Sequence, residues 1–180
     1  MKEMTALEIG KEAPSFQLKG VDGNTHTLES FRGAKAVAVI FMCNHCPYVQ
    51  AYLGRLISLQ NEYAGQGVRF VGINSNETKN YPEDNFENMV RWAKEKKFPF
   101  PYLRDETQEV ATAYGANRTP EIFLLDASFR VCYHGGVDDN TQNPKEVRAH
   151  YLRNAIEDLL QKGSVSQTTS RTIGCTIKWA

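Results

Sequence analysis

The sequence predicts an α/β domain built on a central mixed β-sheet that is flanked by helices, and two groups of elements support this. Residues 36–42 form a continuous apolar run rich in β-branched side chains, and residues 68–73 form a second such run. Between them, residues 47–63 carry apolar side chains at helical spacing. Strand, helix and strand in this order make a right-handed parallel unit. Residues 121–126 and 130–134 lie close enough in sequence to add an antiparallel hairpin.

Before this unit, the sequence predicts a β-hairpin extension at the N-terminus. Two short extended candidates, 16–18 and 25–28, are separated by Val21-Asp22-Gly23-Asn24. Asp-Gly and Gly-Asn are both turn signals, so the two segments are expected to pair.

The middle of the chain predicts two further helices. The polar segment 74–84 is expected to be a loop over the strand ends, and the amphipathic pattern that follows predicts a helix from about residue 86 to 97. Prolines alternate through 98–103, which favours an edge strand or a loop. Residues 108–114 predict a short helix that Gly115 ends.

The last part of the chain predicts one helix and a tail. Asn143-Pro144-Lys145-Glu146 has the pattern of a helix start, and the helix is expected to run to Lys162. Residues 164–170 are polar and predict an extended linker, whereas 172–179 are apolar enough to dock back on the body. We therefore expect one domain over residues 1–163 and a C-terminal tail, 164–180, that is not a second domain.

Composition limits the class of protein and its partners. The chain has 180 residues, enough for one domain to bury a core without disulfides, and its 21 basic and 21 acidic residues leave no net charge. This balance argues against nucleic acid or an anionic membrane surface as a partner. No stretch has the apolar length of a signal peptide or membrane span, so we expect a cytoplasmic protein. Four cysteines in a reducing compartment favour redox or metal chemistry over a disulfide framework.

The candidate site is Cys43-Asn44-His45-Cys46, which lies where the buried strand ends and the long helix begins. Unpaired N–H groups and the helix dipole favour a thiolate there. In a CxxC at a helix start, the first cysteine is the exposed nucleophile and the second resolves the mixed disulfide, so these roles fall on Cys43 and Cys46. No second CxxC or paired-histidine motif completes a zinc site, and Pro47 stands where haem attachment needs histidine. We expect no cofactor and no metal.

This order of elements, with a CxxC at the first strand-to-helix junction and Thr119-Pro120 before the hairpin, resembles the thioredoxin fold. Residues 10–16 and Phe31-Arg32-Gly33 are similar to the N-terminal extension of the redoxin branch, which contains the peroxiredoxins and the TlpA/ResA-type thiol-disulfide oxidoreductases. The resemblance spans about residues 8–162, and 174–179 is similar to the tail of an uncharacterised peroxiredoxin-like group. It implies a thiol-disulfide oxidoreductase with an antioxidant role, whose partners are protein or small-molecule thiols and disulfides.

The resemblance also suggests roles around the cysteines. His45 matches the histidine of the DsbA-type CPHC site, where it would stabilise the Cys43 thiolate; the alternative is a solvated loop residue. Pro120 resembles the cis-proline that faces the CxxC, which would turn the Thr119 backbone toward a substrate chain. Glu121 is a substitute for the buried acid that thioredoxin has at the position of Val37, or else a solvated residue at the strand edge.

The remaining cysteines differ in what they predict. Cys132 lies in Val131-Cys132-Tyr133 and is expected to be a small buried residue. Cys175 lies beyond a flexible linker that would let it reach the site as a third, resolving thiol; packing of the tail is the alternative.

Two other functions stay open. The first is a peroxiredoxin-like thiol peroxidase in which Cys46 is peroxidatic and peroxides are partners. The peroxiredoxin motif has Pro where this chain has Val39, and Thr or Ser where it has Cys43. Arg118 is the candidate for the peroxidatic arginine, but it lies two residues away from the position that the family spacing requires. The second is a copper chaperone resembling the SCO group, with Cys43, Cys46 and His134 as ligands, although that group spaces its cysteines by three residues.

Overall fold

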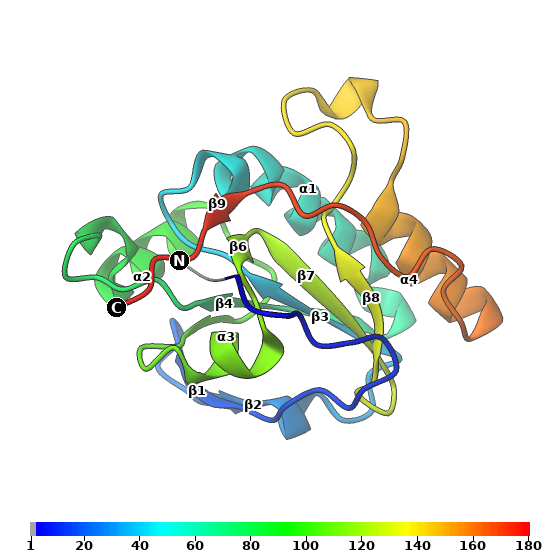
Figure 1. Cartoon of the computed structure of the whole chain (residues 1–180), viewed down its shortest axis with the longest axis horizontal. Helices are drawn as coiled ribbons and strands as arrows, with labels where there is room; N and C mark the ends of the chain where they lie inside the picture. The colour runs from blue at the N-terminus through cyan, green and yellow to red at the C-terminus, as the bar shows by residue number, and fades with distance from the viewer. Residues whose placement is uncertain (1–2) are drawn as a thin grey trace.

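A seven-stranded mixed sheet forms the centre of the computed structural model, which describes residues 3–180 (Figure 1). The strand order is β2-β1-β5-β4-β3-β7-β8, with β6 and β9 forming a separate pair. The strands are β1 (Gln17–Gly20), β2 (Thr25–Thr27), β3 (Ala36–Phe41), β4 (Val68–Asn74), β5 (Tyr102–Arg104), β6 (Arg118–Thr119), β7 (Glu121–Asp126), β8 (Val131–Gly135) and β9 (Cys175–Thr176).

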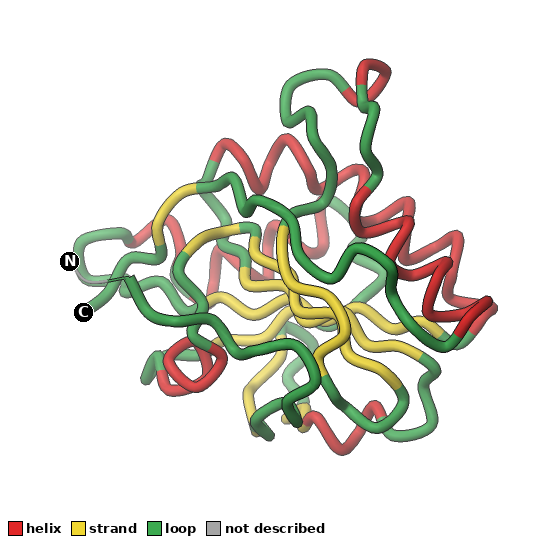
Figure 2. The backbone as a smooth tube through the Cα atoms, turned by 45° about the vertical axis from the view of Figure 1, so that its right-hand side comes forward, coloured by secondary structure: helices red, strands yellow, loops and turns green. Residues whose placement is uncertain are grey.

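Helices cover both faces of this sheet, so that the strands lie inside the molecule (Figure 2). The helices are α1 (Pro47–Tyr63), α2 (Phe86–Glu95), α3 (Glu109–Tyr114) and α4 (Tyr151–Lys162). Apolar side chains of α1, α2 and α4 share one buried cluster, the thiol-side core. Those of α3 and the N-terminal segment share a second cluster, the opposite core.

Strand β3 sets the geometry of both cores. All of its residues are buried; it pairs in parallel with β4 and antiparallel with β7. Its side chains alternate, so Ile40 faces the thiol-side core and Phe41 faces the opposite core. Two parallel-paired apolar runs joined by a helix are what the sequence pattern predicts, and this prediction is confirmed.

The other predicted elements are confirmed with two exceptions. Strand β5 is not at an edge, because β1 pairs beyond it through Lys19 and Arg104. The single helix predicted from Asn143 is interrupted: a 3-10 turn at Pro144–Glu146 is followed by extended residues, and α4 begins only at Tyr151. The reason is that Arg148 N donates to the Asp139 side chain and Asp139 N donates to Ala149 O, which holds 148–149 alongside the preceding loop.

The C-terminal tail docks on the body, as predicted. It runs from α4 across the molecule to β9, which pairs antiparallel with β6 (Figure 1). Beyond β9, Ile177 is 2 % exposed in the opposite core, and Lys178 N donates to the Asn76 side chain at 2.9 Å. Before β9, Ser170 N donates to His134 O at 3.2 Å, so the tail is held on both sides of Cys175.

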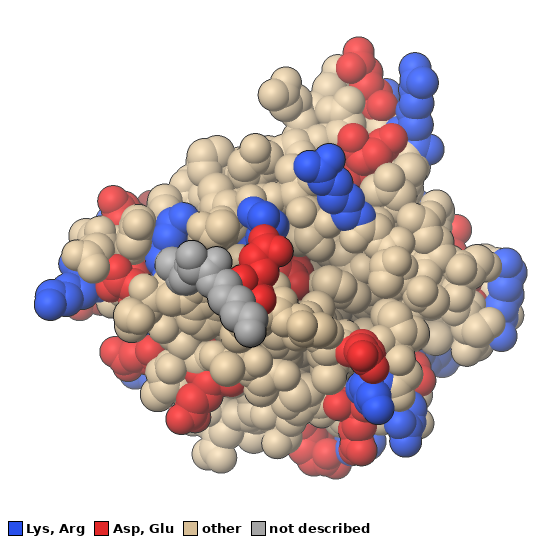
Figure 3. Space-filling view, in the orientation of Figure 1, with Lys and Arg blue, Asp and Glu red and all other residues tan. Residues whose placement is uncertain are grey.

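The surface carries both signs of charge. Basic and acidic side chains are intermixed over the face shown in Figure 3. Within residues 3–180, no helix combines the length and apolar character needed to cross a membrane.

Candidate active site

The loop between β3 and α1 presents the two cysteines of the CxxC. Cys46 is the N-cap of α1, with extended backbone angles of φ −67° and ψ 124°, and Pro47 takes the first helical position. Proline suits that position because its missing N–H would have no partner there. The helix start predicted from Pro47 is thus confirmed, and it puts Cys46 rather than Cys43 at the helix terminus.

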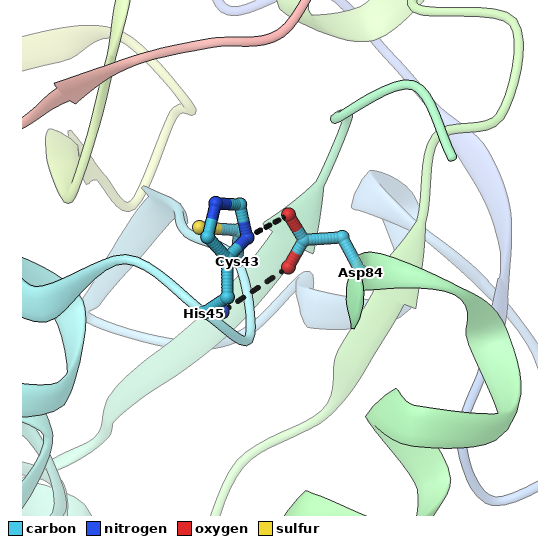
Figure 4. Close-up of side chains that lie close together, drawn as sticks. All are labelled: Cys43, His45 and Asp84. Atoms are coloured by element: carbon cyan, nitrogen blue, oxygen red, sulfur yellow. Dashed lines mark hydrogen bonds and ion pairs between the residues drawn. The ribbon is translucent and has the colours of Figure 1, made fainter. Parts of the chain in front are cut away.

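A buried carboxylate holds the loop in place. Asp84 has no exposed surface, and its Oδ1 accepts the peptide N–H groups of Asn44 at 2.7 Å and His45 at 3.2 Å. Its Oδ2 accepts the Asn76 side-chain amide at 2.9 Å and pairs with Nδ1 of His45 (Figure 4). Asp84 was not among the residues that the sequence singles out, because it ends a polar segment in which several acids have the same local setting.

His45 is oriented by this carboxylate and by an aromatic neighbour. Its ring stacks on Tyr81 with 5.9 Å between centroids. Cys43 Sγ, a ring nitrogen of His45 and a carboxylate oxygen of Asp84 all lie within 4.8 Å of one another. The three donors are of types that bind metals, yet both Asp84 oxygens already accept hydrogen bonds or pair with His45. The arrangement fits a positioning role for Asp84 better than a metal centre.

Both cysteine side chains of the pair are fully buried. The sequence predicts an exposed Cys43, and the structure contradicts this because Cys43 lies beneath the loop in the thiol-side core. Cys43 Sγ is 3.6 Å from the Thr119 hydroxyl, and Cys46 Sγ is 3.5 Å from the Thr119 carbonyl oxygen. The Thr119–Pro120 peptide bond is cis, as predicted, so this backbone faces the thiols.

The two thiols differ in acidity. Hydrogen bonding to Cys46, burial and the negative charge of Asp84 raise the pKa of Cys43. Hydrogen bonding from Cys43 lowers the pKa of Cys46, with further lowering by Cys175 and by the peptide N–H of Val49, against the opposing effect of burial. These effects favour Cys46 as the more acidic thiol of the pair.

Glu121 and His134 lie away from the thiols. Glu121 alternates with Ile122, whose side chain is in the thiol-side core, so Glu121 faces the other side of the sheet. There its carboxylate accepts the N–H groups of Asn117 and Arg118 and lies 2.7 Å from His134 Nε2. This geometry does not support the expected proton exchange between Glu121 and the resolving thiol. It also does not support His134 as a copper ligand beside Cys43.

The structure brings Cys175 to the pair, whereas Cys132 stays apart. Cys175 Sγ lies 2.6 Å from Cys46 Sγ, although 129 residues separate them in sequence. Cys132 Sγ donates to Leu124 O at 3.2 Å, and burial raises its pKa to about 12. Of the two sequence alternatives for Cys175, the geometry supports the one that takes it to the site.

Arg118 is engaged by other groups. Its guanidinium donates to Glu3 at 2.9 Å and to Gly174 O at 3.5 Å. Arg118 therefore anchors the tail and the N-terminal segment. Its guanidinium is bound to these two groups and not to the thiols, as a peroxidatic arginine would be.

A CxxC between a buried strand and a helix, facing a cis-proline, defines a thioredoxin-like protein. The AhpC/TSA family model matches residues 9–134, and the chain belongs to this family. The thiol-disulfide oxidoreductase ResA of Geobacillus thermodenitrificans is 31% identical over 132 residues, which cover 72% of this chain and 70% of ResA. The predicted redoxin-branch membership is confirmed, and the protein is an oxidoreductase of the thiol-disulfide class.

Two solved structures extend the comparison. An uncharacterised conserved protein from Geobacillus kaustophilus is 42% identical with a TM-score of 0.91, covering 99% of this chain and 96% of that one. The thioredoxin domain of a thiol-disulfide oxidoreductase from Bacteroides vulgatus is 20% identical with a TM-score of 0.68, covering 87% of this chain and 100% of that one. The second shares the fold, which confirms the predicted thioredoxin fold.

Proposed function

We propose that this protein catalyses thiol-disulfide exchange with Cys46 as the reactive thiolate and Cys43 as the resolving thiol. The observation that carries the proposal is the position of Cys46 at the start of α1, where its neighbours lower its pKa. A thiolate is the nucleophile in exchange, and a sulfur of low pKa is also the better leaving group. The proposal reverses the roles that the order of the cysteines in the sequence predicts.

The steps in the reducing direction follow from these roles. The Cys46 thiolate attacks one sulfur of a disulfide presented to it, so a mixed disulfide forms and one substrate thiolate leaves. Cys43 then loses its proton to a released thiolate and attacks Cys46 Sγ, forming the Cys43–Cys46 disulfide and releasing the second substrate thiolate, which takes a proton from water. Two electrons pass from the cysteines to the substrate, and the same steps run backward when a dithiol is oxidised.

A polypeptide is the substrate class that the site favours. The backbone of β6 pairs at Thr119 with the chain's own strand β9, directly beside Cys46, so an extended main chain already fits against this site. Main-chain pairing of this kind recognises extended peptide segments. Peroxide has less support, because Cys43 stands where a peroxidatic site has a hydroxyl and Arg118 is bound to Glu3 and Gly174.

Reduction of insulin by dithiothreitol tests the proposal. The protein should accelerate this reduction, and Cys46→Ser should abolish the acceleration. Cys43→Ser should stop turnover and leave Cys46 held in a disulfide that mass spectrometry detects. Cys132→Ser is the matched control and should keep the rate, because Cys132 lies apart from the pair. An unchanged rate in Cys46→Ser would contradict the proposal.

A further inference from the structure

The buried pair needs a route to its substrate. Neither Cys43 nor Cys46 has exposed side-chain surface, whereas Cys175, which lies against Cys46, is partly exposed. Cys46 Sγ is the one sulfur of the three that contacts both others. It can therefore exchange its disulfide bond between a buried partner, Cys43, and a partner closer to the surface, Cys175.

The position of Cys175 is built into the fold. Cys175 pairs with Thr119 in the β6–β9 ladder, and Ile177 N donates to Asn117 O at 2.9 Å. A Cβ added to Gly174 would lie 2.1 Å from Thr119 O, so only glycine allows this approach. The tail thus takes the place beside β6 where a substrate strand would pair, and it brings a cysteine to the exchange point.

We propose that Cys175 is a third redox thiol of this protein, which takes the disulfide from Cys46 and presents it to a polypeptide dithiol at the surface. The proposal deepens the proposed function and rests on it, since Cys46 must first exchange with Cys43.

The relay conserves atoms and electrons. Starting from the Cys43–Cys46 disulfide, Cys175 attacks Cys46 Sγ as a thiolate; the Cys46–Cys175 bond forms, the Cys43–Cys46 bond breaks, and Cys43 takes the proton that Cys175 lost. A substrate thiolate then attacks Cys175 Sγ and Cys46 leaves as a thiolate. The second substrate thiol displaces Cys175, which returns to its starting form. Substrate loses two electrons and two protons, and Cys43 and Cys46 gain the electrons.

The acidities of the sulfurs suit the steps that follow transfer of the disulfide to Cys175. Burial and the neighbouring Cys46 raise the pKa of Cys175 to about 11, so in the reduced protein Cys175 remains a thiol, with its Sγ 2.6 Å from Cys46 Sγ. When a substrate thiolate attacks Cys175, the leaving group is Cys46, whose pKa is lowered. In the reducing direction the same steps run backward. Cys175 attacks the substrate disulfide as a thiolate and one substrate thiolate leaves; the Cys46 thiolate then attacks Cys175 Sγ and the second substrate thiolate leaves. Cys43 finally gives up its proton and attacks Cys46 Sγ, and Cys175 leaves and takes up a proton.

Peptide mapping tests whether the relay bond forms. Cys43→Ser, treated with oxidised glutathione and digested without reductant, should yield a peptide pair joined through Cys46 and Cys175. The Cys175→Ser variant should still yield the Cys43–Cys46 pair, and its circular dichroism should match that of the parent protein. Absence of the Cys46–Cys175 pair in Cys43→Ser would overturn the proposal.

Turnover tests whether the relay is used. Cys175→Ser should slow insulin reduction by dithiothreitol at least tenfold. Gly174→Ala keeps all three thiols but displaces the tail from Thr119, and it should slow the reaction to a similar degree. Cys132→Ser should match the parent protein.

The outcomes separate the two proposals. If Cys46→Ser is inactive but Cys175→Ser and Gly174→Ala react as fast as the parent or faster, the tail only covers the site and the relay is wrong. If Cys46→Ser is fully active, the proposed function itself fails.

Discussion

Replacing Asp84 with asparagine tests whether one buried carboxylate holds the thiol loop. Asparagine keeps one oxygen for the N–H groups of Asn44 and His45, but it puts an NH₂ group where Oδ2 accepts the Asn76 amide. Two donors then face each other in a position without exposed surface. The remaining hydrogen bonds also lose the charge of their acceptor.

The cost follows from these contacts. A buried donor without a partner costs about 1–3 kcal/mol, and each hydrogen bond that loses a charged acceptor weakens by about 1 kcal/mol. We expect Asp84→Asn to lower the free energy of unfolding by about 3–5 kcal/mol. With a urea slope of about 2 kcal/mol/M, the midpoint should fall by about 1.5–2.5 M.

Urea unfolding of the reduced protein, followed by circular dichroism, measures this change. The matched control is Asp105→Asn, because Asp105 is also fully buried and accepts the Ser75 hydroxyl and the N–H groups of Val110 and Ala111. Both variants should lose stability. Only Asp84→Asn should lower the pKa of Cys43, since the charge of Asp84 raises it.

Two results would refute the reasoning. One is an Asp84→Asn protein whose unfolding free energy lies within about 0.5 kcal/mol of the parent, the range of ordinary surface substitutions. The other is an equal change in the titration of Cys43 in both variants, which would point to a general loosening instead of the charge of Asp84.

Three further predictions concern the thiolate, the loop before α4 and the opposite face of the sheet. Cys46→Ser should remove the thiolate ultraviolet absorbance that the reduced protein shows at neutral pH. In the parent protein the lowered pKa keeps Cys46 ionised at this pH, so the absorbance should fall only as the pH drops through that pKa. Arg55→Ala should lower the unfolding free energy, measured in urea, by about 3–5 kcal/mol, because it leaves the buried Asp138 carboxylate without the guanidinium 2.8 Å away; a loss similar to that of an exposed ion pair would contradict this. Glu121→Gln should leave the pH profile of insulin reduction unchanged, because Glu121 faces His134, and a shifted profile would return Glu121 to the thiol chemistry.

The sequence was sufficient for the scaffold because its signals are local. Apolar runs define β3 and β4 as buried strands, and Pro47 with the helical spacing after it defines α1. The cis bond at Pro120 also follows from its place before a strand in a thioredoxin-like order. Each of these predictions depends on residues within a few positions of one another or on the order of elements.

Glu121 shows where local reasoning ends. Its place next to Pro120 suggests that it faces the thiols, but strand β7 pairs with β3 in a register that turns Ile122 to that side. Because side chains alternate along a strand, Glu121 must point the other way. The register, which depends on packing of the whole sheet, decides the matter.

What the sequence by itself determined is therefore the CxxC at a strand-to-helix junction, its cis-proline neighbour and the class of chemistry. Tertiary structure alone decided which groups surround the two sulfurs. Asp84 reaches Asn44 across 40 residues, and Cys175 reaches Cys46 across 129. No local pattern records such contacts, because they form only when separate elements pack and bury the groups that meet between them.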